Sequence, residues 1–172
     1  KAEVVAEVAD LPLSIVEVHL ADLLAREWAM FREARQLWQL TPVGREEHRV
    51  ALVRDIGGGK LSELLAPSYA AFLAVNEQFK ELCGDWQLKE AQPNDHVDAA
   101  YDRSVIDRLV ALDREVAPVV QQMGDVLNRL VPYGPRLART CQRVVEGETN
   151  MFTGVMCGSY HDVWMELHED LI

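Results

Sequence analysis

Apolar residues recur at every third or fourth position along much of the chain, a period typical of amphipathic helices. The clearest stretch covers residues 14–40, where one stripe of a helix would be apolar. The residues of this stripe are Val16, Leu20, Leu23, Leu24, Phe31, Ala34 and Trp38. Ser14 and Glu17 have the spacing of a capping box, in which a hydroxyl and a carboxylate satisfy free amides at a helix start. The sequence therefore predicts a first helix of about seven turns.

Proline and glycine divide the rest of the chain into further helical stretches. Thr41 followed by Pro42 is typical of an N-cap and the first position of a helix. The glycine run 57–59 disfavours continuation of that helix, and Gly84 has the position of a C-terminal cap. The helices predicted in this way span residues 42–56, 61–83 with its main part beginning at Pro67, 104–130 with Ser104 at its start and a kink at Pro118, 135–147, and 160–172. Residues 51–56 are also compatible with a strand.

Two segments have weaker patterns. Residues 85–103 are polar, so they predict a connection, and His96–Tyr101 within it is compatible with a short helix. Residues 148–158 are compatible with a helix, a strand or a tight loop.

The chain as a whole contains no internal repeat, no low-complexity tract and no linker rich in glycine and serine. We therefore expect a single all-α domain over residues 1–172, an up-and-down bundle of about five to seven helices. The sequence does not begin with Met and ends abruptly at residues 168–172. From these ends we expect that the sequence is a portion of a slightly longer chain, and a removed leader sequence is compatible with them.

The composition is ordinary for a globular protein, with 49% of the 172 residues hydrophobic and 26% charged. Lys and Arg number 17 against 28 Asp and Glu, which gives a formal net charge of -11. Residues 1–86 hold 9 basic and 14 acidic side chains, and residues 87–172 hold 8 and 14, so the acidic excess is evenly spread between the two halves. Since phosphate backbones are bound chiefly by clustered Lys and Arg, the sequence predicts no nucleic-acid partner.

No apolar run approaches the roughly 20 residues that cross a bilayer, so we expect no membrane partner. The N-terminal residues include acids where a signal peptide is apolar. The three cysteines are an odd number, lie far apart and form no Cys-x-x-Cys pair; they are Cys83, Cys141 and Cys157. This usage favours a reducing compartment, and we expect a soluble cytoplasmic protein.

The segment Gly57–Lys60 invites comparison with a phosphate-binding loop, in which glycine amides cradle phosphate and a lysine reaches its outer oxygens. The match fails at two positions. Arg54 stands where the first glycine would be, and Leu61 stands where a hydroxyl must follow the lysine. We therefore interpret the segment as a flexible connector.

Two residues of the first predicted helix are candidate ligand-binding groups. Glu27 falls on the apolar stripe between Leu24 and Phe31, where an unpaired charge is costly to bury. Three explanations are open: it pairs with an arginine, lies at the margin of the stripe, or binds a ligand. The first two are favoured because buried carboxylates are usually compensated locally. His19, near the edge of the stripe, joins Glu27 only if the helix borders an open cavity.

The last predicted helix carries a candidate metal pair. His161 and His168 share one face at a spacing of seven, and Trp164 between them is a candidate ligand-binding residue. The sequence has neither the Glu-x-x-His of di-iron bundles nor the His-Glu-x-x-His of zinc proteases. The favoured alternative is an amphipathic helix whose histidines fringe the packed face. The identity of any cofactor stays unknown.

The same helix carries a candidate partner surface. Its acidic residues, with no basic residue among them, are Asp162, Glu166, Glu169 and Asp170. An exposed acidic face is the ordinary solvated side of a helix, but it also suits a basic partner. Ser159 and Asp162 have the spacing of a helix start with an acidic first turn, which predicts that the helix begins at Tyr160.

No nucleophile motif of the Gly-x-Ser-x-Gly kind is present, so the enzyme question stays open and leans toward no. Two classes of function are expected. The first, slightly favoured, is a non-enzymatic regulatory or accessory subunit that binds a partner protein, or a second copy of itself, through an acidic face. The second is a helical bundle that binds a metal, a haem or a small aromatic ligand between its helices.

Overall fold

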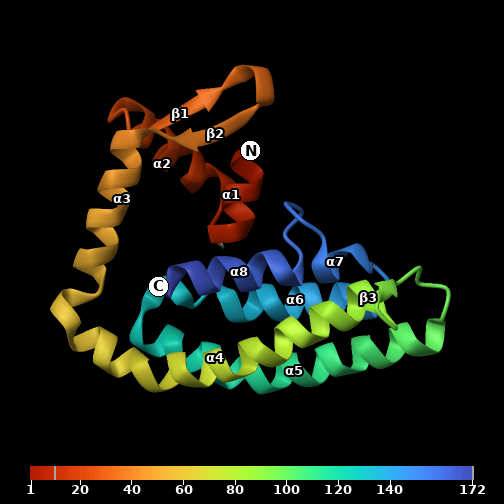
Figure 1. The fold of residues 1–172 in the computed structure, drawn as a ribbon. Coiled ribbons are helices and arrows are strands. Elements are labelled where there is room, and N and C mark those ends of the chain that lie inside the picture. Colours follow the sequence, from red (N-terminus) through yellow and green to blue (C-terminus); the bar gives the residue numbers. More distant parts are fainter. Residues whose placement is uncertain (10, 172) are drawn as a thin grey trace. The chain divides into compact units, whose positions relative to one another are not determined.

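The computed structural model describes residues 1–9 and 11–171. The described residues form eight α-helices and two small antiparallel sheets of two strands each (Figure 1). The all-α fold class is therefore confirmed. The chain packs as two compact units, unit 1 (Lys1–Ser62) and unit 2 (Glu63–Ile172). The expectation of a single domain stays a prediction.

Unit 1 begins with two helices that pack against each other and continues with a hairpin and a third helix. In chain order its elements are α1 (Ala2–Ala9), α2 (Leu13–Ala25), β1 (Ala29–Arg32), β2 (Leu37–Leu40) and α3 (Pro42–Asp55). α1 packs against α2, α2 against β1, and β2 against α3. A 3-10 turn over Gly57–Gly59 connects α3 to the next helix.

α2 ends at Ala25, so the predicted seven-turn helix is wrong in its second half. Two backbone hydrogen bonds close its last turn, from the amide of Trp28 to the carbonyl of Leu23 at 2.9 Å and from the amide of Glu27 to the carbonyl of Leu24 at 3.0 Å. This pair of bonds is a Schellman motif, which stops a helix by satisfying its last carbonyls.

The hairpin explains why the helical interpretation failed. Phe31 and Trp38 are seven residues apart, a spacing that places two side chains on one face of a helix. In the structure they are cross-strand partners in the β1–β2 ladder, with ring centroids 5.3 Å apart. A separation of seven satisfies both patterns, and the turn at residues 33–36 distinguishes them. The Ser14 capping box is also wrong, because α2 begins one residue before Ser14 and its N-cap, Pro12, makes no side-chain cap.

Glu27 holds the left-handed position after α2, with a φ of 58°. Glycine is the residue that adopts this conformation without steric cost. We expect Glu27→Gly to raise the free energy of unfolding by about 0.5–1 kcal/mol, measured as a higher midpoint in urea denaturation. Glu27→Ala keeps the Cβ atom and is the control; equal midpoints for the two variants would contradict this explanation.

The predicted start of α3 is confirmed. The hydroxyl oxygen of Thr41 accepts the amide of Gly44 at 3.0 Å, and Pro42 occupies the first turn. Thr41 also ties the helix to the end of α2, because its hydroxyl donates to the carbonyl of Glu27 at 2.7 Å and its amide to the carbonyl of Trp28 at 3.0 Å. Gly44 is buried against Trp28. The start of α3 is therefore fixed against the chain that enters the hairpin.

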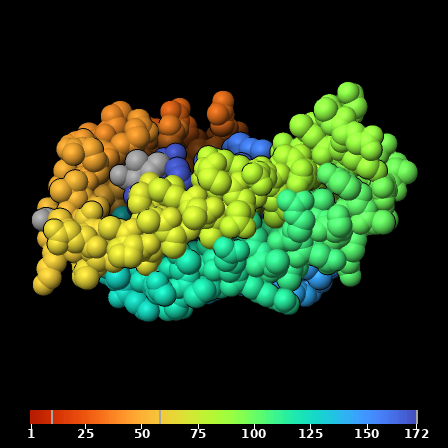
Figure 2. Space-filling model, turned by 60° about the horizontal axis from the view of Figure 1, so that its bottom comes forward, coloured from red at the N-terminus to blue at the C-terminus, as the bar shows by residue number. Residues whose placement is uncertain are grey.

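Unit 2 is a bundle of helices. Its elements in chain order are α4 (Lys60–Gln87), β3 (Leu88–Lys89), β4 (Gln92–Pro93), α5 (Ala99–Val126), α6 (Tyr133–Val145), α7 (Asn150–Thr153) and α8 (Tyr160–Asp170). α4 and α5 lie side by side (Figures 1 and 2), and Gln78 Nε2 donates to Glu115 Oε1 across them at 3.3 Å. α6 packs against α5 and α8. The fully buried core residues include Phe72, Leu109, Met123, Phe152, Tyr160 and Trp164.

Several predicted boundaries in unit 2 are wrong. α4 continues through both Pro67 and Gly84. α5 begins before the predicted Ser104, because the carboxylate of Asp98 accepts two amides of the first turn at 3.0 and 3.1 Å and caps the helix there. Between α4 and α5 the chain forms the β3–β4 hairpin and a loop, where a short helix from His96 was compatible with the pattern.

The other helix predictions in unit 2 are confirmed. α5 stays helical across Pro118, where the predicted kink stays a prediction, and α6 ends close to Gly147. α8 begins at the expected capping box, in which Ser159 and Asp162 each accept the other's backbone amide. Residues 148–158, for which the pattern allowed three conformations, form the short helix α7 and a loop.

Candidate functional site

The two candidate ligand-binding residues of the first predicted helix lie at the surface of unit 1. His19 is exposed on α2. Glu27 follows the end of α2 and is exposed as well, so its predicted place on a buried stripe is wrong. Neither residue lines the cavity between α1, α2 and the hairpin or the second cavity at the hairpin turn. The structure therefore does not bring these two side chains to a shared site.

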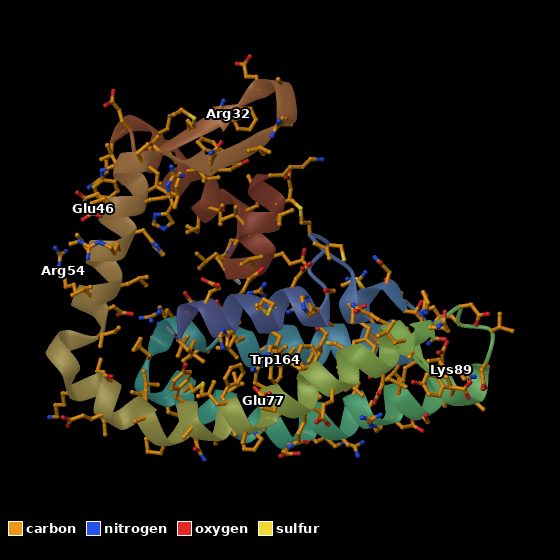
Figure 3. All side chains as sticks on the ribbon, in the orientation of Figure 1. Arg32, Glu46, Arg54, Glu77, Lys89 and Trp164 are labelled. Atoms are coloured by element: carbon orange, nitrogen blue, oxygen red, sulfur yellow. The ribbon has the colours of Figure 1, made fainter. Side chains whose placement is uncertain are left out.

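Trp164 lies in the core of unit 2 (Figure 3). Its ring stacks on Phe72 with centroids 4.9 Å apart and packs on Phe79 at 4.5 Å. The indole N–H donates to Asn76 Oδ1 at 2.8 Å. Because other side chains of the protein pack against the ring and accept its N–H, the structure favours a core role for Trp164 over ligand binding.

His161 and His168 lie on either side of Trp164 along α8 and pack against α4. The ring centroid of His161 is 6.2 Å from that of Phe79, and the ring centroid of His168 is 6.1 Å from that of Phe72. Across residues 1–9 and 11–171, no group of three His, Cys, Asp or Glu side chains could hold a metal ion. The two histidines border the packed face of α8.

Three of the four acidic residues predicted as a partner surface make contacts inside unit 2. Asp162 accepts four backbone amides of the loop before α8, at 2.9 to 3.4 Å. Glu166 pairs with the buried Arg136 at 2.5 Å. Asp170 accepts a tyrosine hydroxyl at 2.7 Å, and Glu169 is exposed. Partner binding at these residues stays a prediction, but three of the carboxylates already serve the fold.

A group of titratable side chains is partly or fully buried among the helices of unit 2. The hydroxyl of Tyr160 on α8 donates to Asp113 Oδ1 on α5 at 3.1 Å. Burial raises the pKa of the Asp113 carboxyl, and the hydrogen bond from Tyr160 opposes that rise in part. Burial also raises the pKa of the Cys83 thiol and that of the Cys141 thiol to about 12. At neutral pH these thiols stay protonated, which makes them poor nucleophiles.

The raised pKa of Asp113 predicts a pH-dependent stability. The folded chain holds this proton to a higher pH than the unfolded chain does, so the contribution of Asp113 to stability is lost as pH rises through the folded pKa. Asp113→Asn removes the charge and keeps an oxygen that accepts the Tyr160 hydroxyl. We expect a higher thermal midpoint than wild type at pH 7 and a difference that disappears toward pH 3, where wild-type Asp113 is protonated.

Thermal unfolding followed by circular dichroism at several pH values measures this difference. Asp107→Asn, an exposed position on the same helix, is the matched control and should show no such gain at pH 7. A gain from Asp113→Asn that does not depend on pH would rule out the carboxyl charge as its cause.

Sequence reasoning missed a helix–turn–helix in unit 1. α1 ends at Ala9, α2 begins at Leu13, and the two helices pack against each other. Two packed helices this close together in the chain are typical of the motif. The apolar period over residues 14–40 obscured it, because the period ran on into the hairpin. Pro12 was an available signal, since proline is frequent near the start of a helix.

The face of α2 that points away from its buried residues carries short, uncharged side chains. With 3.6 residues per turn, Ser14, Val18 and Ala25 lie opposite the buried positions, and all three are exposed. Asp22 borders this face, but its carboxylate pairs with Arg26 at 2.8 Å. Such a face allows a close approach to another macromolecule.

The β1–β2 hairpin presents positive charge next to α2. Arg32 (Figure 3) and Arg35 are exposed on it, with the single acid Glu33 between them. Arg32 Nε donates to Gln39 Oε1 at 3.2 Å. Unit 1 as a whole holds 8 basic and 10 acidic residues, whereas unit 2 holds 9 and 18. Most of the negative charge therefore belongs to unit 2.

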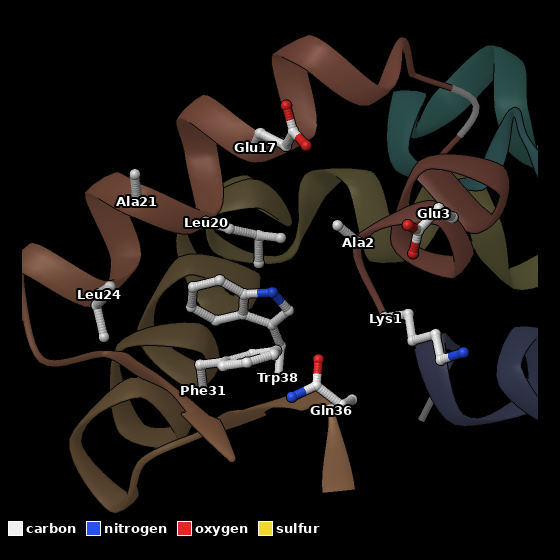
Figure 4. A pocket seen from close by; sticks show the side chains of 10 residues that line it. All are labelled: Lys1, Ala2, Glu3, Glu17, Leu20, Ala21, Leu24, Phe31, Gln36 and Trp38. Carbon is white, nitrogen blue, oxygen red and sulfur yellow. The ribbon is translucent and has the colours of Figure 1, made fainter. Parts of the chain in front are cut away.

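A cavity of about 540 Å³ lies between α1, α2 and the hairpin (Figure 4). Phe31 and Trp38 of the hairpin line it together with Leu20 and Leu24 of α2. The polar residues that line the cavity are Lys1, Glu3, Glu17 and Gln36. An apolar wall with a few polar groups is typical of small-molecule sites.

A second polar cluster that the sequence did not indicate lies in the loop before α5. Asn94 Nδ2 donates to Asp102 Oδ1 at 2.9 Å, and Asp102 Oδ2 lies 3.0 Å from His96 Nδ1. The His96 ring packs on Trp86 with centroids 4.6 Å apart. These contacts hold the loop against the end of α4.

No protein-family model, no curated protein and no solved structure matches this chain. Within the part of the chain that the structure describes, no helix has the length and apolar character needed to cross a membrane.

Proposed function

We propose that the protein is a non-enzymatic regulator whose unit 1 binds double-stranded DNA. The observation that carries the proposal is the order of elements: two packed helices close together in the chain, then a hairpin with two exposed arginines. In helix–turn–helix proteins the second helix enters the major groove. α2 takes that place in our proposal, and the hairpin supplies contacts to the phosphate backbone.

The side chains of these elements suit the two kinds of contact. Ser14 on the outer face of α2 is able to hydrogen-bond a base edge, and Val18 is able to contact a thymine methyl group. The planar guanidinium groups of Arg32 and Arg35 suit phosphate oxygens. Few phosphate contacts are available, so base contacts and DNA shape have to supply much of the specificity.

The net charge of the whole chain predicts no nucleic-acid partner. When the charges of the two units are counted separately, they argue less strongly against DNA binding by unit 1. Unit 1 carries 8 basic and 10 acidic residues and is close to neutral, and the larger acidic excess lies in unit 2. An acidic second unit weakens non-specific attraction to phosphate without removing the local arginines. One experiment distinguishes the prediction of no nucleic-acid partner from the proposal that unit 1 binds DNA.

That experiment selects duplexes from a random-sequence pool with the full chain and measures their affinity by fluorescence anisotropy. Val18 is 66% exposed, so Val18→Glu should leave the fold intact while placing a carboxylate on the outer face of α2. We expect its affinity for the selected duplex to fall at least tenfold. Val53→Glu on α3, at a site 61% exposed, is the matched control and should bind within twofold of wild type.

The hairpin arginines are tested through the salt dependence of binding. We expect the double variant Arg32→Ala with Arg35→Ala to reduce the slope of log affinity against log salt by about 2, since each phosphate contact contributes about 0.9. Arg103→Ala on α5 of unit 2 is the control. The proposal is overturned if the pool yields no enriched duplex, or if Val18→Glu binds the selected duplex as wild type does.

A further inference from the structure

We infer that the cavity of unit 1 is a binding site for an amphipathic organic cation. Its volume of about 540 Å³ is within the range of small-molecule sites. All of its lining residues belong to the first 38 residues, so the site is complete within unit 1. The inference does not depend on DNA binding.

The cavity leaves large apolar side chains partly open to solvent. Leu24 of α2 is 47% exposed and Phe31 of β1 is 38% exposed, although both face the same cavity. Exposed apolar residues gathered around a concavity are typical of a binding surface. A ligand with an apolar body would cover them.

The aromatic pair favours a cation among apolar ligands. The rings of Phe31 and Trp38 are 5.3 Å apart and tilted by 53°, and in Figure 4 they lie together beneath Leu20. The face of an indole ring is the best aromatic partner for a cation. A neutral apolar ligand would gain only the apolar contact.

The charged lining residues support the same ligand class. Glu3 on α1 and Glu17 on α2 bring two carboxylates to the cavity, and Lys1 has the one basic side chain that lines it (Figure 4). Attraction at such open sites is modest, so the apolar walls supply affinity and the carboxylates supply preference for positive charge.

Two probes of similar shape and opposite charge test the inference, tetraphenylphosphonium and tetraphenylborate. Their binding to the full chain is measured by isothermal titration calorimetry without DNA. We expect the phosphonium ion to bind at least tenfold more tightly than the borate ion. Equal or tighter binding of the borate, or no binding of either probe, overturns the inference.

Variants locate the bound probe. Leu24→Trp fills the cavity with an apolar side chain at a partly exposed position, and we expect it to weaken phosphonium binding at least tenfold. Glu17→Gln should weaken that binding about threefold, and Glu7→Gln, on the exposed surface of α1 outside the cavity, should leave it unchanged. Unchanged binding in Leu24→Trp, as would result from attraction to acidic unit 2, also overturns the inference.

Discussion

Gly44→Ala should destabilise unit 1 by about 3 kcal/mol or more. A Cβ atom at this buried position would stand 1.8 Å from the carbonyl oxygen of Trp28 and 2.6 Å from its carbonyl carbon. Both are backbone atoms, so no side-chain rotation relieves the overlap. α3 must move away from the chain that enters the hairpin, and the bonds from Thr41 to Glu27 and Trp28 would be broken. Alanine's higher helix propensity, about 1 kcal/mol, does not offset this loss.

Hydrogen exchange measured by mass spectrometry resolves the effect by segment. We expect faster exchange in Gly44→Ala over residues 28–44, together with a lower urea midpoint for that unit. Gly84→Ala is the matched control, because it lies inside α4 with no neighbouring atom within 4 Å of the added Cβ. The control should gain about 0.5–1 kcal/mol. If both glycine variants gain stability, Gly44 does not lie in close contact with the backbone of Trp28.

Trp164→Phe should cost unit 2 about 2–3 kcal/mol, the second large effect. The indole ring is fully buried against two phenylalanine rings, so its truncation leaves a cavity in the core. Its N–H donates to Asn76 Oδ1, and Asn76 is only 7% exposed. The truncation therefore leaves a buried acceptor without its donor, which adds the desolvation cost of that group.

A double-mutant cycle separates the two contributions. Asn76→Leu alone strands the indole N–H, whereas Trp164→Phe with Asn76→Leu removes both polar atoms. We expect the double variant to lose at least 1 kcal/mol less than the sum of the single losses in urea denaturation. Trp86 is also buried but lies on α4, so Trp86→Phe keeps the Asn76 bond and is the control for ring size. Additive losses would mean that the hydrogen bond contributes nothing.

The sequence was sufficient for the all-α class and for elements with short-range signals. Thr41 caps α3 through an amide three residues later, and Ser159 caps α8 in the same way. Such bonds join residues close in the chain, so their spacing alone specifies them. α5 is helical on both sides of Pro118, as a kinked helix also is, so the predicted kink stays a prediction.

The candidate site was much less accessible to sequence reasoning. The acidic side chains of α8 looked like a surface, yet Glu166 pairs with Arg136, thirty residues earlier in the chain. Trp164 looked like a ligand group, yet its partner Asn76 is eighty-eight residues away. Pairs at such distances have no fixed spacing, and one sequence does not reveal them.

By itself, the sequence determined that the chain is predominantly helical, where α3 and α8 begin, and that an apolar stripe starts in α2. Only the tertiary structure decided that the stripe leaves the helix at Ala25, where Phe31 and Trp38 become partners across a hairpin. The physical reason is that their spacing of seven fits a helix face and a strand ladder equally well. Packing of the hairpin against α2 and α3 selects the second, and with it the helix–turn–helix and its cavity.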